Sequence, residues 1–317
     1  MNRNAFPAAL ALTGLALAAT PALADTRMEK NLTLAAGGEF HLQTDMGAVT
    51  VTGSPDAGAH VVITSRRKDL DDLLTFRFEE GANSATVIAK KKHRGSWFSS
   101  DHGGSVLYEI QVPANTRLTL DTSGGSIHVS GMRAAAKLET SGGGIRVEDL
   151  VGDLNADTSG GSIDLKNIKG KMRVETSGGS VEGSNLDGAV HAESSGGSIE
   201  LQKVTGDIDA ETSGGGIRIE EAGGHIHADT SGGSIEASFT KGNSAGGSLE
   251  TSGGGIEVSV DPQADLSIQA SGSSVKTELP LKVQGEISRG SLSGSLGKGG
   301  NTLRLHTSGG SVRIQSI

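Results

Sequence analysis

The sequence predicts an all-β fold, a single-chain parallel β-solenoid, on three observations. A seven-residue motif recurs every 18 residues: an acid, Thr or Ser, Ser-Gly-Gly, Ser or Gly, and a β-branched residue. Apolar and polar residues alternate on both sides of each motif, as they do in strands with one buried face. The 49 glycines are frequent and fall at fixed phases of the repeat. A period this regular indicates one structural unit stacked on itself.

Seven copies of the motif stand in strict register, beginning at Asp121, Glu139, Asp157, Glu175, Glu193, Glu211 and Asp229. A further copy begins 21 residues later at Glu250, a degenerate copy (QASGSSV) begins at Gln269, and HTSGGSV begins at His306. We therefore expect a solenoid domain over residues 114–317. Its regular rungs would cover 117–246, with irregular rungs beyond.

Each rung is predicted to contain two short strands and two glycine turns. In the rung 152–169 the residues on the inward face are Leu154, Ala156, Thr158, Ile163, Leu165 and Ile168. The paired glycines suit turns that need positive φ, or turns that must stack without Cβ collisions. Parallel stacking at about 4.8 Å per rung pairs each backbone group with the neighbouring rungs. Crossovers between parallel strands are nearly always right-handed, so we expect a right-handed solenoid.

Residues 1–24 are predicted to be a signal peptide. Arg3 precedes an apolar run over residues 8–19, and residues 22–24 (Ala-Leu-Ala) match a signal-peptidase site. No later segment approaches the ~20 apolar residues of a transmembrane helix. The chain has no cysteine, which excludes disulfides and a lipid-bearing cysteine. We expect an exported bacterial protein of the periplasm or cell surface.

Residues 25–113 are predicted to form degenerate strands that cap the rod. The segment QTDMGAV from Gln43 occupies the place of the motif. Most of the large aromatic residues lie in this part, whereas Phe239 is the only aromatic after Asp121. A thicker terminal unit is expected because the end of a solenoid must cover an open sheet edge.

Three segments resemble the DUF4097 family of bacterial β-strand-repeat proteins, described as candidate adhesins. They are LYEIQVPANTRLTLDTSGGSIHVSG from Leu107, the repeated D/E-T-S-G-G units, and NTLRLHTSGGSVRI from Asn301. The resemblance spans roughly residues 39–317. It implies a single-chain β-helix and an adhesive role, and it supplies no catalytic residues.

Charge argues against nucleic acid as a partner. Without Arg3, the chain has 27 Lys and Arg against 37 Asp and Glu, a net charge of −10. A phosphate backbone is bound by basic surfaces.

The acid that opens each motif copy is expected to form an outward column, one strand spacing apart. This acid column comprises Asp121, Glu139, Asp157, Glu175, Glu193, Glu211, Asp229 and Glu250. Such a row could bind Ca²⁺ or another hard cation through carboxylate oxygens. The alternative, which we favour, is that each acid accepts Gly-Gly amide hydrogens or pairs with a neighbouring base such as Lys137 or Arg173.

A second outward column brings histidines together. His191, Asp209 and His227 share one phase in three successive rungs, and His225 lies two residues before His227. Imidazole and carboxylate ligands at this spacing could bind Zn²⁺ or another transition metal. The same phase holds Lys137 and other polar residues elsewhere, which favours a solvated, mixed column.

The motif threonines are expected to point inward, where stacked hydroxyls could satisfy each other. An ice-binding surface, the alternative for a threonine array, would need them exposed.

One segment combines basic and aromatic residues: Lys90, Lys91, Lys92, Arg94, Trp97 and Phe98. It could contact an anionic glycan, lipid headgroups or a protein, with Trp97 as the anchor. Equally, it could be a strand end whose aromatics cover the core.

Taken together, these patterns predict a non-enzymatic, adhesin-like or structural protein of the cell envelope. It would bind a glycan or protein through extended faces and would need no cofactor. The main alternative is a polysaccharide-active β-helix enzyme, which would use paired carboxylates. That alternative is disfavoured because the repeats offer no aromatic platform for a sugar chain.

Overall fold

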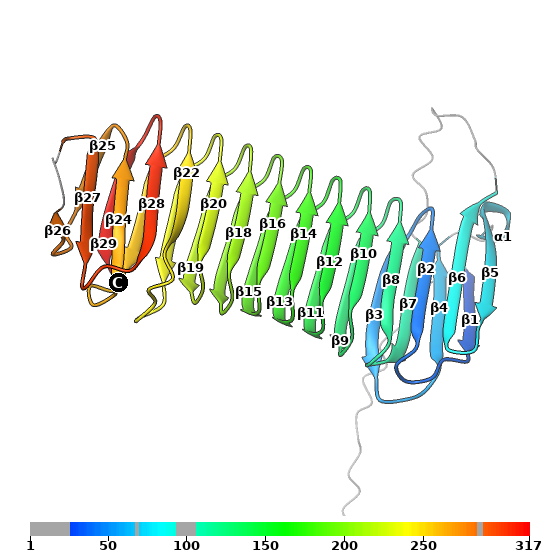
Figure 1. Ribbon diagram of the computed structural model, residues 1–317. Coiled ribbons are helices and arrows are strands. Elements are labelled where there is room, and N and C mark those ends of the chain that lie inside the picture. The colour runs from blue at the N-terminus through cyan, green and yellow to red at the C-terminus, as the bar shows by residue number, and fades with distance from the viewer. Residues whose placement is uncertain (1–25, 67–69, 93–105, 284–287) are drawn as a thin grey trace, which may run out of the picture.

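The structure, a computed structural model, describes residues 26–66, 70–92, 106–283 and 288–317. The predicted signal peptide, residues 1–24, lies outside them. The described chain forms a long flat rod of two facing sheets (Figure 1), together with one short helix, α1 (Leu70–Leu73). No helix among the described residues has the length and apolar character needed to cross a membrane.

Strands alternate between the two sheets along the rod. In spatial order, the 14-stranded sheet contains β1 (Thr26–Leu32), β4 (Ala59–Ser65), β7 (Val106–Pro113), β3 (Ala48–Ser54), β9 (Ile127–Met132), β11 (Ile145–Val151), β13 (Ile163–Lys169), β15 (Val181–Asp187), β17 (Ile199–Val204), β19 (Ile217–Ala222), β21 (Ile235–Phe239), β23 (Ile256–Val260), β29 (Ser311–Ser316) and β25 (Ser274–Thr277). The 15-stranded sheet contains β26 (Lys282–Val283), β27 (Ser291–Leu296), β24 (Leu266–Ser271), β28 (Asn301–Thr307), β22 (Gly247–Thr251), β20 (Ile226–Thr230), β18 (Ile208–Thr212), β16 (Val190–Ser194), β14 (Met172–Thr176), β12 (Leu154–Thr158), β10 (Ala136–Thr140), β8 (Arg117–Thr122), β2 (Glu39–Thr44), β6 (Ser84–Lys91) and β5 (Leu74–Glu80).

The predicted β-solenoid is confirmed, with two strands per 18-residue rung. Ala156 of β12 pairs in parallel with Leu138 of β10 and Val174 of β14, so residues 18 apart are neighbours. The inward residues of both strands are buried and form one continuous core between the sheets. The handedness of the solenoid stays a prediction.

Close stacking explains the second glycine of each Ser-Gly-Gly turn. A Cβ placed on Gly161 would lie 2.2 Å from the carbonyl oxygen of Gly143 in the preceding rung. The same closeness, 2.1 to 2.2 Å, recurs at Gly179, Gly197 and Gly215. None of these four residues has positive φ. Of the two predicted reasons for the glycines, the collision of stacked Cβ atoms is therefore the correct one here.

In the other glycine turn of the rung, by contrast, Gly152, Gly170 and Gly188 do have positive φ, between 143° and 156°. Positive φ also occurs inside the second strand of the rung, mostly at residues that are not glycine. The residues are Asp149, Asn167, Asn185, Lys203 and Glu221, with φ between 55° and 57°, and Gly131 has φ 70° at the same phase. This left-handed residue inserts one position into the alternation, so that Leu165 and Ile168 both point inward. The sequence pattern indicated the inward residues but not the bulge between them.

The motif threonines are buried, as predicted, but they do not satisfy one another. The Thr158 hydroxyl donates to the carbonyl oxygen of Gly143 in the rung before, at 2.7 Å. It also accepts the amide hydrogen of Gly161, at 3.3 Å. Each hydroxyl thus ties its own turn to the preceding one. Their burial contradicts the ice-binding alternative.

The ends of the rod break the chain order. The rung β2–β3 lies between β6–β7 and β8–β9, with Thr44 of the QTDMGAV segment paired to Thr122 as its motif position predicts. At the other end, β28–β29 lies between β22–β23 and β24–β25 (Figure 1). Antiparallel strands end both sheets at one end of the rod (β1 and β5) and the 15-stranded sheet at the other (β27 and β26), where the 14-stranded sheet ends on the parallel strand β25. The predicted boundary at residue 113 falls between β7 and β8, within the same pair of sheets.

The degenerate copy at Gln269 is out of register with the motif before its turn and in register after it. His306 pairs with Ser271 and not with Gln269. Beyond the turn, Val275 pairs with Val312, as the motif predicts. The turn after β24 is therefore two residues shorter than the turn after β28.

Candidate functional site: a carboxylate and histidine surface

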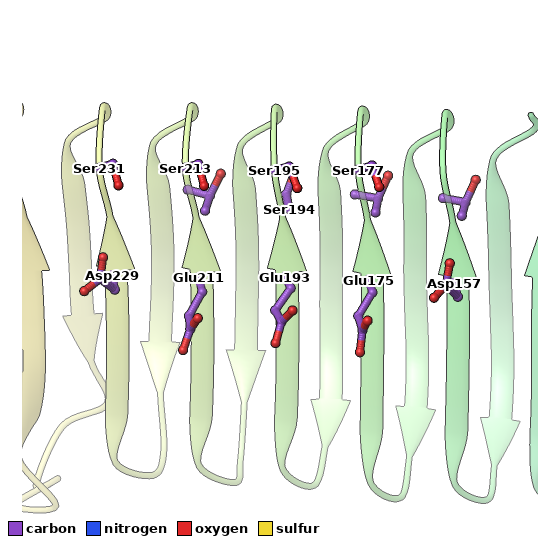
Figure 2. A pocket seen from close by; sticks show the side chains of 13 residues that line it. Asp157, Glu175, Ser177, Glu193, Ser194, Ser195, Glu211, Ser213, Asp229 and Ser231 are labelled. Carbon is purple, nitrogen blue, oxygen red and sulfur yellow. The ribbon is translucent and has the colours of Figure 1, made fainter. Parts of the chain in front are cut away.

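The acid column follows the outer face of the 15-stranded sheet. Asp157, Glu175, Glu193, Glu211 and Asp229 pair in register on successive strands. The last four lie below the turn serines Ser177, Ser195, Ser213 and Ser231 (Figure 2). Together with those serines they line an open groove of about 320 Å³. The column is thus a surface that repeats with the rungs.

Bases beside the column neutralise part of it. Lys137 Nζ lies 2.8 Å from Glu139 Oε1, and this contact raises the pKa of the Lys137 ammonium group. Arg173 contacts Glu175 closely and lies 3.9 Å from Glu193. These are the two pairs predicted from the sequence. The predicted acceptance of Gly-Gly amide hydrogens by the acids is wrong, because the threonine hydroxyls accept them.

Asp157 lies in the column without such a base on its own strand. Partial burial raises the pKa of its carboxyl group, and the neighbouring carboxylates Glu175 and Glu139 raise it further, while Lys137 opposes them. Repulsion between stacked acids is therefore present at this residue. Binding of Ca²⁺ by the acid column stays a prediction.

The register places His191, Asp209 and His227 side by side on β16, β18 and β20. Asp209 Oδ2 lies 2.8 Å from His191 Nδ1, and His191 Nε2 lies 2.6 Å from Glu193 Oε1. Asp209 Oδ1 is buried and has no hydrogen-bond partner among the described residues.

Two groups on this surface bring three ligand atoms within 4.8 Å of one another. The first group is Glu175, His191 and Glu193, and the second is Asp209, Glu211 and His227. Each group takes two residues from one strand, spaced i and i+2, and the third from a neighbouring strand. His225, predicted as a ligand, belongs to neither group. It is exposed, and its backbone amide donates to Asp207 Oδ1 at 2.9 Å.

The glutamates of these groups are partners of the histidines that the sequence did not predict, because the acid column and the histidine column occupy different phases of the repeat. The alternation of strands could have joined them, because residues i and i+2 lie on the same face.

The basic and aromatic segment is described only in part. Lys90, Lys91 and Lys92 are exposed at the end of β6. The Lys91 amide donates to Asp45 Oδ2 at 2.8 Å, and the Lys92 amide donates to the carbonyl oxygen of Leu73 at 2.9 Å. Arg94, Trp97 and Phe98 lie outside the described residues. A contact role for the segment stays a prediction.

Comparison with known proteins identifies a family model, Toastrack DUF4097, that matches residues 41–315. No curated protein matches the chain. Among solved structures, a candidate cell adhesion protein from Clostridium sporogenes is 11% identical, with a TM-score of 0.28 and coverage of 92% of this chain and 100% of that chain. A candidate adhesin from Bacteroides fragilis is 12% identical, with a TM-score of 0.33 and coverage of 92% and 97%. A candidate lipid-binding protein from Parabacteroides distasonis is 13% identical, with a TM-score of 0.31 and coverage of 92% and 96%.

Proposed function

Since the chain belongs to the Toastrack DUF4097 family, we propose that it is a non-enzymatic, adhesin-like rod of the bacterial cell envelope. It would bind a glycan or protein component of the envelope or of a surface through its extended faces. The observation that carries this proposal is the in-register repetition of the same outward groups on successive rungs, acids on the strands and serines at the turns.

A repeated surface favours binding over catalysis. A polymeric partner that lies along the rod would meet an equivalent carboxylate and hydroxyl about every 4.8 Å. Many weak contacts of this kind add up through effective concentration. A catalytic site, by contrast, needs a nucleophile, acid or base that differs from its surroundings at one place.

The polysaccharide-active alternative lacks support in the repeats. Phe239 is the only aromatic residue after Asp121, and it is buried between the sheets. The outer faces of the rungs therefore offer no exposed ring on which a sugar could stack. Export rests on the predicted signal peptide.

The first test is the location of the protein. Cells are treated with protease, fractionated and blotted for the chain that begins at Asp25. Loss of the protein from whole cells would support the surface role. Protection until the outer membrane is opened would restrict the proposal to a periplasmic scaffold.

The second test compares attachment by a deletion strain with attachment by strains that carry variants. One variant neutralises the acid column (Asp157→Asn, Glu175→Gln, Glu193→Gln and Glu211→Gln). A matched control makes the same kinds of change on four successive strands of the opposite sheet (Glu148→Gln, Asp164→Asn, Glu182→Gln and Glu200→Gln). We expect deletion to reduce attachment, the control to restore it fully and the column variant to restore it poorly. Unchanged attachment after deletion, or turnover of envelope polysaccharide by the pure protein, would contradict the proposal.

A further inference from the structure

We propose that Asp209, Glu211 and His227 form a binding site for one divalent transition-metal ion of the zinc class. The site would lie on the outer face of the 15-stranded sheet, across β18 and β20. This inference does not depend on the adhesive role.

The three side chains converge because of strand geometry. Asp209 and Glu211 are i and i+2 on β18, so they leave the same face of the strand. His227 pairs directly with Asp209 from the adjacent parallel strand β20. One ligand atom from each residue lies within 4.8 Å of the others.

The spacing within the group suits a bridging ion. His227 Nε2 and Glu211 Oε1 are 3.9 Å apart, too far for a hydrogen bond. Zinc binds nitrogen and oxygen ligands at about 2.0–2.2 Å, so one ion can span this gap with a small inward movement of exposed side chains.

Asp209 also has a carboxylate oxygen without a partner. Asp209 Oδ2 already accepts a hydrogen bond from His191 Nδ1 at 2.8 Å, while Oδ1 is buried and unpartnered among the described residues. A buried carboxylate oxygen without a donor or cation is costly. A small side-chain rotation that brings Oδ1 to an ion would remove that cost, with the His191 ring as the outer partner that orients the carboxylate.

The neighbouring group, Glu175, His191 and Glu193, is less suited to a metal. Arg173 contacts Glu175 and lies 3.9 Å from Glu193, so a positive charge is already present. Both ring nitrogens of His191 are also engaged, with Asp209 and Glu193. In the part of the chain that the structure describes, no Lys or Arg pairs with Asp209, Glu211 or His227.

The donor set indicates the class of ion. One imidazole nitrogen with two carboxylate oxygens suits Zn²⁺ and related transition metals, whereas Ca²⁺ takes oxygen ligands alone. The half-exposed position of Glu211 and His227 leaves the remaining coordination sites to water. The ion would join two rungs and offset two charges of the outer face.

The test is calorimetric titration of ZnCl₂ into the untagged, exported protein, repeated for single variants that are checked for folding by circular dichroism. We expect one site for the wild type, and a loss of affinity of roughly tenfold or more for His227→Gln and for Glu211→Gln. His225→Gln is the matched histidine control, because His225 is exposed and outside the group, and it should bind as the wild type does. Co²⁺ in place of Zn²⁺ should give visible absorption bands that His227→Gln weakens.

Glu175→Gln distinguishes the two groups of ligands. Its affinity should stay within about twofold of the wild type, because Glu175 is paired with Arg173 and lies outside the proposed site. Absence of binding by the wild type, unchanged affinity of His227→Gln, or loss of affinity in Glu175→Gln alone would each overturn the assignment.

Discussion

The two glycines of one Ser-Gly-Gly turn face different surroundings. The Cβ position of Gly161 lies 2.2 Å from a backbone oxygen that cannot move aside, whereas that of Gly160 has no neighbour closer than 3.4 Å. The sequence has glycine at both places in every regular copy, so it could not separate the two. Only the distance between stacked turns reveals which one the backbone requires.

We therefore expect Gly161→Ala to destabilise the rod by about 1–3 kcal/mol, the usual cost of forcing atoms into a packed site. Gly160→Ala should be neutral or slightly stabilising, because an ordinary φ accepts alanine and the unfolded chain loses entropy. The midpoints of thermal unfolding of the two variants check this. Equal midpoints would show that stacking does not explain the conserved pair within the repeat.

At Asp157 the electrostatic consequence of stacking can be measured. Its carboxyl pKa is raised, so the folded protein binds the proton more tightly than the unfolded chain does. Ionised Asp157 therefore opposes folding at neutral pH, and this opposition disappears as the pH falls through its folded pKa toward the ordinary value of 3.8.

Asp157→Asn should accordingly stabilise the protein at pH 7 by up to roughly 1 kcal/mol, the repulsion of one like-charge pair in water. The gain should vanish at pH 3. Asp164→Asn is the control on the opposite sheet, where Asp164 pairs with Arg146 at 3.0 Å, and it should bring no gain. Urea unfolding of both variants at the two pH values measures the difference. A gain that persists at pH 3 would contradict the electrostatic explanation.

At the scale of the strand, the left-handed residue sets the shape of the second half of each rung. The apolar character of Leu165 and Ile168 predicts that both face inward. They are three residues apart, so strict alternation would place them on opposite faces. The sequence signature of the bulge is partial, since Gly131, Asp149, Asn167 and Asn185 are residue types that favour positive φ, whereas Lys203 and Glu221 are not. Lys203 adopts this conformation between bulged neighbours on both sides, whereas Glu221 has a bulged neighbour only in β17, because β21 lacks the extra residue.

Substitutions at Asn167 test this requirement. Asn167→Val should destabilise the rod by about 1–2 kcal/mol more than Asn167→Gly, because a β-branched residue is strained at positive φ. Both variants lose the side-chain contacts with Asp149 at 2.8 Å and Asn185 at 3.1 Å, so the comparison isolates the backbone. Hydrogen exchange of β13 and its neighbours measures the local effect. Equal protection in the two variants would argue against strain.

At the scale of the whole molecule, the sequence predicted the regular middle far better than the ends. A constant 18-residue period leaves one register for the middle rungs, and the columns that contain His191, Asp209 and His227 follow from it directly. At the ends the motif still marks rungs at Gln43 and His306, but it does not say on which rung they stack. Edge coverage decides that, since antiparallel strands lie at the sheet edges: β1 and β5 are outermost at one end of the rod, and β26 and β27 complete the 15-stranded sheet at the other.

The candidate metal group shows the same limit on a smaller scale. The register gave the histidine neighbours correctly. The sequence does not show which of these residues have free ligand atoms. That depends on side-chain contacts such as those of Arg173 and His191.

The placement of β28–β29 between β22–β23 and β24–β25 also affects the order in which the strands can fold. The ribosome completes β24–β27 before it begins β28, yet in the folded rod β28 and β29 separate those strands from the rest. The earlier-made segment therefore lacks its native neighbours until β28 and β29 have been made. Folding from one end to the other can proceed as far as β23, after which the distal cap must wait for the residues that follow it.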